Sequence, residues 1–221
     1  MPDPDASAPD GAPDFSEFAA PARPLREVPL PAITHSRPAH EPSREPPTVR
    51  RDVGVVIVAG GKGTRAGGDE LKQFRWVAGK PMLLHSVQTF MARPDVHTVV
   101  VVLPKSHAAD PPPWLFQCDI ERLLVSTGGR ERAESVANGL EDLPEECETV
   151  LVHDAARPLV PDDLIERVVA EARRGHGAVP ALPVVDTLKE VDESGAIVRT
   201  VDRARLWRVQ TPQGFPRALI D

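Results

Sequence analysis

No run of apolar residues in this 221-residue sequence approaches the roughly 18 to 20 residues that a membrane-spanning helix needs. Positive charge is also in short supply, because 26 Lys and Arg stand against 33 Asp and Glu, which gives a formal net charge of −7. An acidic chain does not offer the general basic surface that attracts nucleic acid. We therefore expect no membrane-spanning segment and no nucleic-acid partner.

Cysteine is scarce as well. Cys118 and Cys147 stand far apart, with no further Cys or His at metal-ligand spacing, and nothing else in the sequence suggests an oxidising compartment. Both are interpreted as structural or incidental thiols. A secretory signal is not expected, since acidic residues such as Asp3, Asp5 and Asp10 fill the start of the chain. A cytoplasmic location is the default expectation.

Proline is the residue in excess, and twelve of the 25 prolines lie in the first 50 residues. This segment is rich in Pro, Ala, Asp and Glu, and its few apolar residues follow neither a strand nor a helix period. Such a composition buries too little apolar surface to offset the entropy lost on ordering. We predict a disordered tail over residues 1–50 and one folded domain over residues 51–221.

After residue 50, short runs of Val, Ile and Leu alternate with longer amphipathic stretches. The runs predict strands over residues 53–59, 98–103, 123–126, 149–153 and 177–182. The amphipathic stretches predict helices over residues 81–91, 131–140 and 161–174, with another helix beginning at Pro216. This alternation predicts an α/β fold with a mostly parallel sheet flanked by helices.

Residues 187–202 depart from the alternation. Two extended segments there flank the turn signal at residues 192–195, which is typical of a β-hairpin. A lone hairpin is only marginally stable in water. We therefore expect it to pack on the body of the domain or on another subunit.

The loops that follow the strands carry the candidate chemistry, because ligands of open parallel sheets bind beyond the carboxyl ends of the strands. Residues 59–65 (AGGKGTR) combine three glycines with Lys62 and Arg65. The segment matches neither the dinucleotide fingerprint nor the P-loop, and a tight connection would explain it equally well. Residues 128–132 (GGRER) repeat the combination before a predicted helix, where backbone N–H groups favour anions.

A third loop places Asp154 and Arg157 just after the strand that ends at His153. Each residue has a purely structural alternative: Asp154 could cap a turn, Arg157 could pair with it, and His153 could be a satisfied core histidine. Taken together, the three loops predict a glycine-lined, cation-rich site with a carboxylate that could face a metal. Phosphoryl or nucleotidyl transfer fits best, because that chemistry depends on positioning and charge neutralisation.

Seven short sequence segments together resemble those of one known family. VAGGKGTR, LKQF, GKPMLLHSV, GGRERAESVANGL, VHDAARPLV, ALPVVDTLK and LWRVQTPQGF occur in this order. With them the sequence resembles the 2-C-methyl-D-erythritol 4-phosphate cytidylyltransferases of the non-mevalonate isoprenoid pathway, over residues 53–219. The resemblance implies a Rossmann-like fold, the substrates CTP and 2-C-methyl-D-erythritol 4-phosphate, and Mg²⁺ or another divalent cation whose ligands stay unassigned. It also implies a homodimer formed partly by exchange of a β-arm, at residues 187–202.

The resemblance further implies roles for individual residues. The residues that would bind CTP are Ala59, Gly60, Gly61, Gly63, Gly129 and Ser135. The residues that would act in catalysis are Arg65, Lys72, Asp154 and Arg203. The residues that would hold the second substrate are Arg157, Thr187 and Thr211. Arg65 and Lys72 would stabilise charge at the α-phosphate. Thr187, Arg203 and Thr211 would grip the methylerythritol phosphate, some of them from the partner subunit.

The sequence departs from the family in places. Leu71 stands where a proline usually precedes the lysine, and the family continues past the position of Asp221 with another substrate-side lysine. We therefore expect a fragment, part of a fusion with a later pathway enzyme, or a short form that lacks part of its site. Two other functions remain open: a ribitol-5-phosphate cytidylyltransferase, or a catalytically incompetent protein that binds nucleotide or dimerises.

Overall fold

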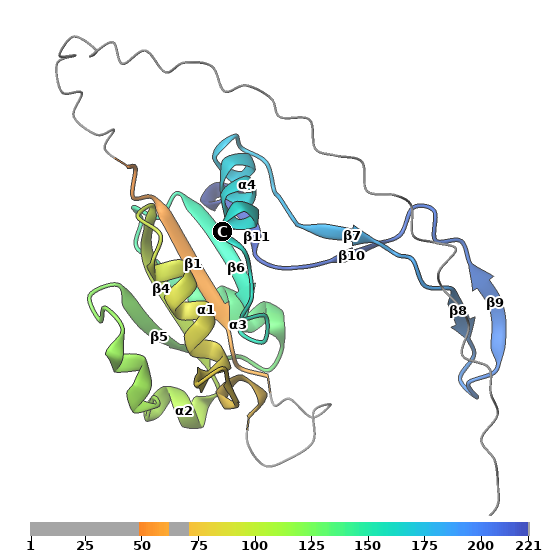
Figure 1. Ribbon diagram of the computed structural model, residues 1–221, viewed down its shortest axis with the longest axis horizontal. Helices are drawn as coiled ribbons and strands as arrows, with labels where there is room; N and C mark the ends of the chain where they lie inside the picture. The colour runs from red at the N-terminus through yellow and green to blue at the C-terminus, as the bar shows by residue number, and fades with distance from the viewer. Residues whose placement is uncertain (1–48, 62–70, 221) are drawn as a thin grey trace, which may run out of the picture. The chain divides into compact units, whose positions relative to one another are not determined.

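The computed structural model describes residues 49–61 and 71–220 (Figure 1). Nearly all of the predicted tail lies outside these residues, so the tail and the domain boundary stay predictions. Gly63 and Arg65 also lie outside the described residues.

The main sheet of the described chain has five strands in the order β11-β6-β1-β4-β5. Their bounds are β1 (Val53–Val58), β4 (Val96–Leu103), β5 (Leu123–Thr127), β6 (Thr149–Asp154) and β11 (Gln213–Pro216). All neighbouring pairs are parallel except β11 with β6. The predicted mostly parallel α/β sheet is confirmed.

Helices cover both faces of this sheet (Figure 1). The three main helices are α1 (Met82–Met91), α3 (Arg132–Glu141) and α4 (Asp162–Arg173). Val55 and Ile57 of β1 pack into one apolar cluster with residues of α1 and α4, whereas Val56 packs into a second cluster with residues around α3. Side chains alternate between the two faces of a strand, and the apolar run of β1 therefore serves two layers of core.

Gly139 lets α3 lie close to the sheet. A Cβ at this position would come within 2.5 Å of Val56 Cγ1 and 2.9 Å of Val102 Cγ2. Any larger residue would push the helix outward or displace these valines. The close fit therefore holds the last turn of α3 against β1 and β4.

Several shorter elements connect the main ones. They are β2 (Trp76–Val77), β3 (Lys80–Pro81), α2 (Lys105–Ala109) and the 3₁₀ turns η3 (Lys72–Phe74), η4 (Pro113–Gln117) and η5 (Arg217–Leu219). The helix predicted from Pro216 is thus, as far as residue 220, a single 3₁₀ turn. Within the described ranges, no helix has the length and apolar character needed to cross a membrane.

One predicted strand has a different partner from the one expected. Residues 177–182 are predicted as a strand within a mostly parallel arrangement, and the strand found there, β7 (Ala181–Pro183), pairs antiparallel with β10 (Trp207–Val209) in a separate ribbon. Pro180 has no N–H with which to continue a ladder, and its carbonyl accepts a hydrogen bond from the Gln210 N–H. A single bridge between Ala178 and Gly214 links this stretch to β11.

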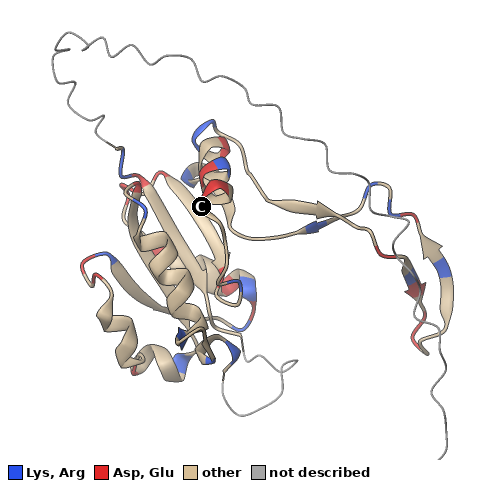
Figure 2. Ribbon diagram, in the orientation of Figure 1, with Lys and Arg blue, Asp and Glu red and all other residues tan. Residues whose placement is uncertain are grey.

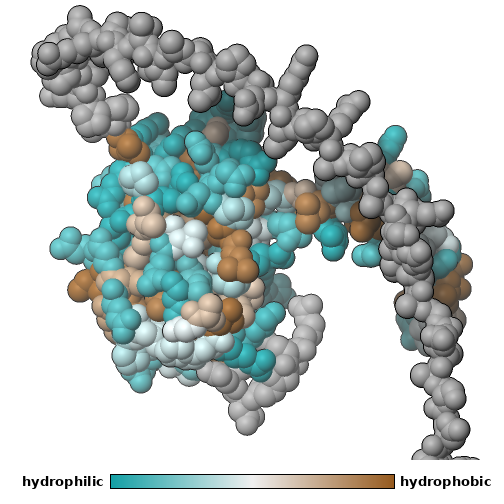
Figure 3. Space-filling view, viewed as in Figure 1, coloured by the Kyte–Doolittle hydropathy of each residue, from teal (hydrophilic) through white to brown (hydrophobic). Residues whose placement is uncertain are grey.

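The predicted hairpin at residues 187–202 is confirmed. Its strands β8 (Leu188–Val191) and β9 (Ile197–Val201) pair antiparallel, and the Asp192 carboxylate accepts hydrogen bonds from the N–H groups of Ser194 and Ala196 in the turn. Most residues of β8 and β9 are exposed, and apolar groups lie at the surface of this region (Figure 3). Its role as a dimerisation arm stays a prediction.

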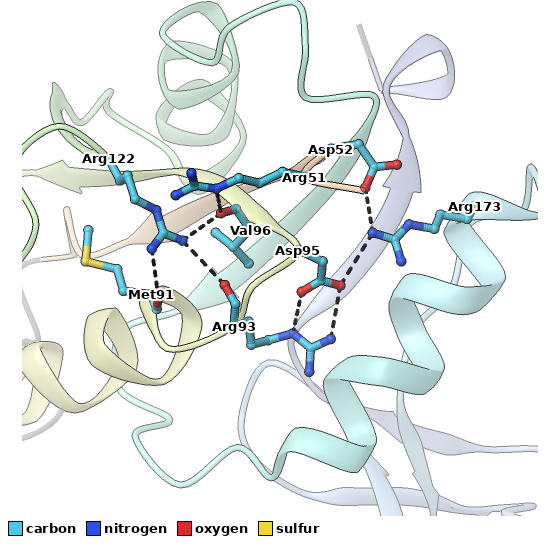
Figure 4. Close-up of polar contacts among 8 residues, drawn as sticks. All are labelled: Arg51, Asp52, Met91, Arg93, Asp95, Val96, Arg122 and Arg173. Carbon is cyan, nitrogen blue, oxygen red and sulfur yellow. Dashed lines mark hydrogen bonds and ion pairs between the residues drawn. The ribbon is translucent and has the colours of Figure 1, made fainter. Parts of the chain in front are cut away.

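A network of charged residues links the end of α4 to the amino ends of the strands (Figure 4). The buried carboxylates of Asp52 and Asp95 lie 2.5 and 3.4 Å from Arg173 Nη2, and Arg93 donates two hydrogen bonds of 3.1 Å to Asp95. Arg122 donates to main-chain carbonyls beside Asp95, including that of Val96 at 2.6 Å. This network pins the start of β1 and β4 to the end of α4, while the carboxyl ends of the strands adjoin the candidate site.

Candidate active site

A cavity of about 360 Å³ lies where the carboxyl ends of β1 and β6 meet the start of α3. The predicted site residues that line it are Ala59, Gly60, Gly61, Lys72, Gly129, Ser135 and Asp154. These residues come from four segments that are far apart in the sequence. The structure therefore brings the three predicted loops together at one edge of the sheet, as expected for an open α/β fold.

Two glycine loops touch at the wall of the cavity. A Cβ at Gly128 would lie 3.4 Å from Gly60 Cα, 3.4 Å from Ser135 Oγ and 3.2 Å from the Leu103 carbonyl oxygen. Ser135 is buried, accepts a hydrogen bond from the Gly129 N–H at 3.1 Å and donates one to the Glu131 carbonyl at 3.0 Å. Its hydroxyl thus shapes the loop ahead of α3.

Gln73 is a residue of the site that the sequence did not single out. It is buried, lines the cavity, and its Nε2 donates to the carbonyl of Ala59 and, at 3.4 Å, to that of Gly61. These bonds fix the carbonyls of the first glycine loop. The sequence marked Gln73 only by its place in the block LKQF. In the structure, the single turn of η3 points Gln73 inward and leaves Lys72 exposed on the cavity wall.

Asp154 lies between two arginines. Its Oδ1 accepts from Arg132 Nε at 3.1 Å and lies 3.0 Å from Arg132 Nη2, while its Oδ2 accepts from Arg157 Nε at 3.3 Å. Arg157 Nη1 donates to the side chain of Gln210. Figure 2 shows positive and negative residues side by side where α3 begins. With Arg130 and Lys72 on the same cavity, this region suits a polyphosphate.

The donor set also suits Mg²⁺. Among the described residues there is no group of three or more His, Cys, Asp and Glu side chains that could hold a metal ion by itself. Mg²⁺ is commonly held by one or two carboxylates together with substrate phosphates and water. Asp154, which reaches the cavity, can supply such a carboxylate once a nucleotide supplies phosphate oxygens.

His153 lies behind the cavity and is fully buried. Its Nε2 is 3.1 Å from the Arg157 carbonyl oxygen, its Nδ1 is 3.1 Å from Thr211 Oγ1, and its ring packs edge-on against Phe90 at a centroid distance of 5.0 Å. Burial lowers the pKa of His153 to about 4, although the Arg157 carbonyl and the Asp154 carboxylate oppose the shift. The imidazole is therefore neutral at pH 7.

The residues predicted to bind the second substrate lie elsewhere. Arg157 and Thr211 line a neighbouring cavity of about 270 Å³. Thr187 and Arg203 lie at the base of the β8–β9 hairpin, with Arg203 Nη1 3.4 Å from Thr187 Oγ1, and neither lines the first cavity. Within the described ranges, the residues predicted to bind CTP therefore form one group at the first cavity. Arg157 and Thr211 form a second group, and Thr187 and Arg203 form a third.

Comparison with known proteins decides the family. The sequence profile of the family IspD, 2-C-methyl-D-erythritol 4-phosphate cytidylyltransferase, matches residues 53–221. The chain belongs to this family. The family match begins with β1 and includes every residue of the candidate site.

Individual relatives agree with this assignment. The chain is 45% identical over 176 residues to "2-C-methyl-D-erythritol 4-phosphate cytidylyltransferase" of Streptomyces coelicolor, covering 75% of this chain and 65% of the relative. It is 40% identical over 167 residues to "Bifunctional enzyme IspD/IspF" of Desulfotalea psychrophila, covering 75% and 43%. The chain therefore spans less than half of the bifunctional relative and about two thirds of the other.

A solved structure supports the fold. The crystal structure of 2-C-methyl-D-erythritol 4-phosphate cytidylyltransferase from Thermus thermophilus matches with a TM-score of 0.60 and 39% identity, over 76% of this chain and 72% of that chain. The Rossmann-like fold implied by the sequence blocks is confirmed.

Proposed function

We propose that this chain transfers CMP from CTP to 2-C-methyl-D-erythritol 4-phosphate, giving 4-diphosphocytidyl-2-C-methyl-D-erythritol and pyrophosphate. Membership of the cytidylyltransferase family supports this activity. The observation that carries the proposal is the cavity itself, in which two glycine loops, Lys72 and Asp154 converge. A site of this kind places backbone N–H groups and cations around phosphates, and this suits a transfer that uses no nucleophilic side chain.

The chemistry needs only direct displacement. A phosphate oxygen of the polyol phosphate attacks the α-phosphorus of CTP, the new P–O bond forms opposite the leaving group, and the bond to pyrophosphate breaks. Lys72, with Arg65 by resemblance, stabilises the negative charge that builds on the α-phosphate oxygens. When bound, Mg²⁺ neutralises charge on the nucleotide phosphates, and Asp154 is the residue that would hold it.

Arg132 and Arg157 hold the Asp154 carboxylate in position. Each arginine makes an ion pair with one carboxylate oxygen, so the side chain is fixed before any ligand binds. Pre-orientation of this kind lowers the cost of assembling the reacting groups. In this proposal Arg157 also faces the polyol phosphate, from the rim of the second cavity.

The second substrate site is completed by another subunit in this proposal. Ile197 and Val198 of β9 and Trp207 of β10 are 66%, 60% and 59% exposed, which is unusual for large apolar residues in one region. A homodimer that exchanges the β8–β9 arm would bury them and would carry Thr187 and Arg203 to the partner's site.

We also place the enzyme in the cytoplasm, where CTP is available.

The direct test measures pyrophosphate release from CTP with each polyol phosphate. The proposal predicts release with 2-C-methyl-D-erythritol 4-phosphate and little with ribitol 5-phosphate. A preference for ribitol 5-phosphate would favour the rival cytidylyltransferase. Thermal protection by CTP without any product would favour a nucleotide-binding protein that has lost catalysis.

A further inference from the structure

Gln73 is a buried side chain that joins the turn η3 to the first glycine loop. It is 5% exposed, and its Nε2 donates to the Ala59 carbonyl and, at 3.4 Å, to the Gly61 carbonyl. Both partners are carbonyl oxygens, which can only accept, so the NH₂ end of the amide must face them. Neither a carboxylate nor an apolar side chain could make these two bonds.

The two bonds determine which way the peptide groups of the loop point. In a planar trans peptide, the carbonyl oxygen and the N–H of the following residue lie on opposite sides. Because the Ala59 carbonyl points to Gln73, the N–H of Gly60 points away from it. The N–H of Ala59 itself is already donated to the Val102 carbonyl at 2.9 Å.

The next two N–H groups of the loop are available to a ligand. Across residues 49–61 and 71–220, no protein acceptor receives the N–H of Gly60 or of Gly61. Both glycines line the first cavity, as do the cationic residues Lys72 and Arg130. Successive backbone N–H groups in a glycine loop bind anions, and the phosphates of a nucleotide are the anions that this cavity suits.

The turn η3 is attached to the rest of the domain on two sides. Phe74, the residue after Gln73, packs against His107 of α2 and Trp114 of η4, with ring centroids 4.9 and 5.8 Å apart. Gln73 supplies the second attachment, to the glycine loop. Lys72 directly precedes Gln73 and lines the cavity, so the same amide sets the position of Lys72 relative to the loop.

We propose that Gln73 is a positioning residue of the nucleotide site: its amide holds the carbonyls of Ala59 and Gly61 and so turns the N–H groups of this loop toward the phosphates of CTP. The inference deepens the proposed function and rests on it for the effect on turnover. The effect on CTP binding can be measured without turnover.

The first experiment measures ligand binding by the full chain. Gln73→Met keeps the length of the side chain and removes both donors. The Kd for CTP should rise roughly tenfold or more, because hydrogen bonds to charged phosphates are lost. The Kd for cytidine, which has no phosphate, should stay within about twofold. Equal weakening of both ligands, or an unchanged Kd for CTP, would overturn the proposal.

A second variant and a control accompany Gln73→Met. Gln73→Glu is nearly isosteric, but its carboxylate would face two carbonyl oxygens, so the Kd for CTP should rise at least as much. Gln88→Met makes the same change as Gln73→Met at an exposed glutamine of α1 that does not line the cavity, and it should leave both Kd values unchanged.

Carbon NMR tests the two hydrogen bonds without any ligand. In the ¹³C-labelled chain, the carbonyl signals of Ala59 and Gly61 should move upfield in Gln73→Met, because a carbonyl that loses its donor is less polarised. The same signals should stay in place in Gln88→Met. Unmoved signals in Gln73→Met would mean that Gln73 does not hold the loop.

Turnover with 2-C-methyl-D-erythritol 4-phosphate tests the link to Lys72. At saturating CTP, Gln73→Met should lower kcat by roughly tenfold, and by less in the Lys72→Ala background, because part of the effect acts through Lys72. Additive losses would contradict this link. If the wild-type chain binds CTP and forms no product, the proposed function fails, and the CTP and cytidine affinities still decide the role of Gln73. A wild type that binds CTP no more tightly than cytidine would overturn that role.

Discussion

Asp154 at the end of β6 and Arg132 at the start of α3 are paired at the wall of the first cavity, with the carboxylate Oδ1 3.1 Å from Nε and 3.0 Å from Nη2. This pair joins the loop after β6 to the loop after β5. It gives the site a carboxylate that is already oriented among cations, which suits an enzyme that must attract phosphates and also hold a divalent ion.

Replacing Asp154 with Asn should separate these two tasks. We expect turnover to fall by roughly 100-fold or more, because the amide is neutral and is a poor ligand for Mg²⁺. CTP binding in the absence of Mg²⁺ should not weaken, since a negative charge beside the phosphates has been removed. Titration calorimetry with and without Mg²⁺ measures both effects. Asp163→Asn, at an exposed position on α4, is the control, and a similar loss there would contradict the role of Asp154.

Lys72→Ala tests stabilisation of the transition state. Lys72 lines the cavity on the turn η3, so removing its ammonium group should lower kcat by roughly 100-fold while the Kd for CTP changes by less than about fivefold. Lys105→Ala on α2 is the matched control, because this exposed lysine does not line the cavity. Equal losses in kcat and CTP affinity would show that Lys72 only binds the nucleotide.

The buried His153 should make stability depend on pH. Burial lowers its pKa to about 4 in the folded protein, whereas an unfolded histidine titrates near 6.5. Between these two values the unfolded state binds more protons, so the stability of the fold decreases as pH falls through this window. Linkage gives a loss of about 2 kcal/mol between pH 7 and pH 5 from this residue alone.

Urea unfolding of the wild type and of His153→Phe at both pH values isolates this contribution, because other groups titrate in both proteins. The wild type should lose about 2 kcal/mol more than the variant on acidification. Equal losses would mean that His153 has an ordinary pKa in the folded state.

The sequence predicted the central layer of the fold well. The valine run of β1 and the β-branched run of β4 are apolar on both faces, which indicates parallel strands between layers of helices, and the structure has them there. Strand β11 could not be foreseen in the same way. Its residues QGFP contain Gly and Pro, and it forms because β6 offers an unpaired edge, a tertiary fact that no local pattern reports.

The candidate site, like the fold, could be predicted from the sequence only in part. Glycine and arginine after each strand predicted where Gly60, Gly129 and Asp154 would meet, because strand ends share one edge of the sheet. The burial of Gln73 and the bonds of Thr211 to the β6 loop depend on segments that are distant in sequence. Thr187 and Arg203, at the base of the β8–β9 hairpin, line neither cavity. Local sequence patterns also do not report contacts with the second subunit that we propose for them.

Gly139→Ala should destabilise the protein by about 1 to 3 kcal/mol, since the new methyl group would overlap Val56 and Val102 in the packed layer beneath α3. Urea denaturation measures the loss. Glu141→Ala, at an exposed position of the same helix, is the control and should change stability by no more than about 0.5 kcal/mol. A neutral effect of Gly139→Ala would mean that α3 lies farther from the sheet.

Ile197→Lys tests the proposed arm exchange. A charge on the exposed apolar face of β9 would be buried without a partner in a dimer, so sedimentation should show a shift toward monomer. Ile120→Lys introduces the same change at an equally exposed isoleucine outside the arm and should leave the oligomer intact. An unaltered dimer in Ile197→Lys would remove β9 from the interface.

The most direct test of the central proposal is ³¹P NMR of the purified 221-residue chain with CTP, Mg²⁺ and 2-C-methyl-D-erythritol 4-phosphate. The proposal predicts equal growth of pyrophosphate and of the two coupled diphosphate signals of 4-diphosphocytidyl-2-C-methyl-D-erythritol, and no such growth with Lys72→Ala over the same time. CTP that stays intact, or a diphosphate product formed faster from ribitol 5-phosphate, would contradict it.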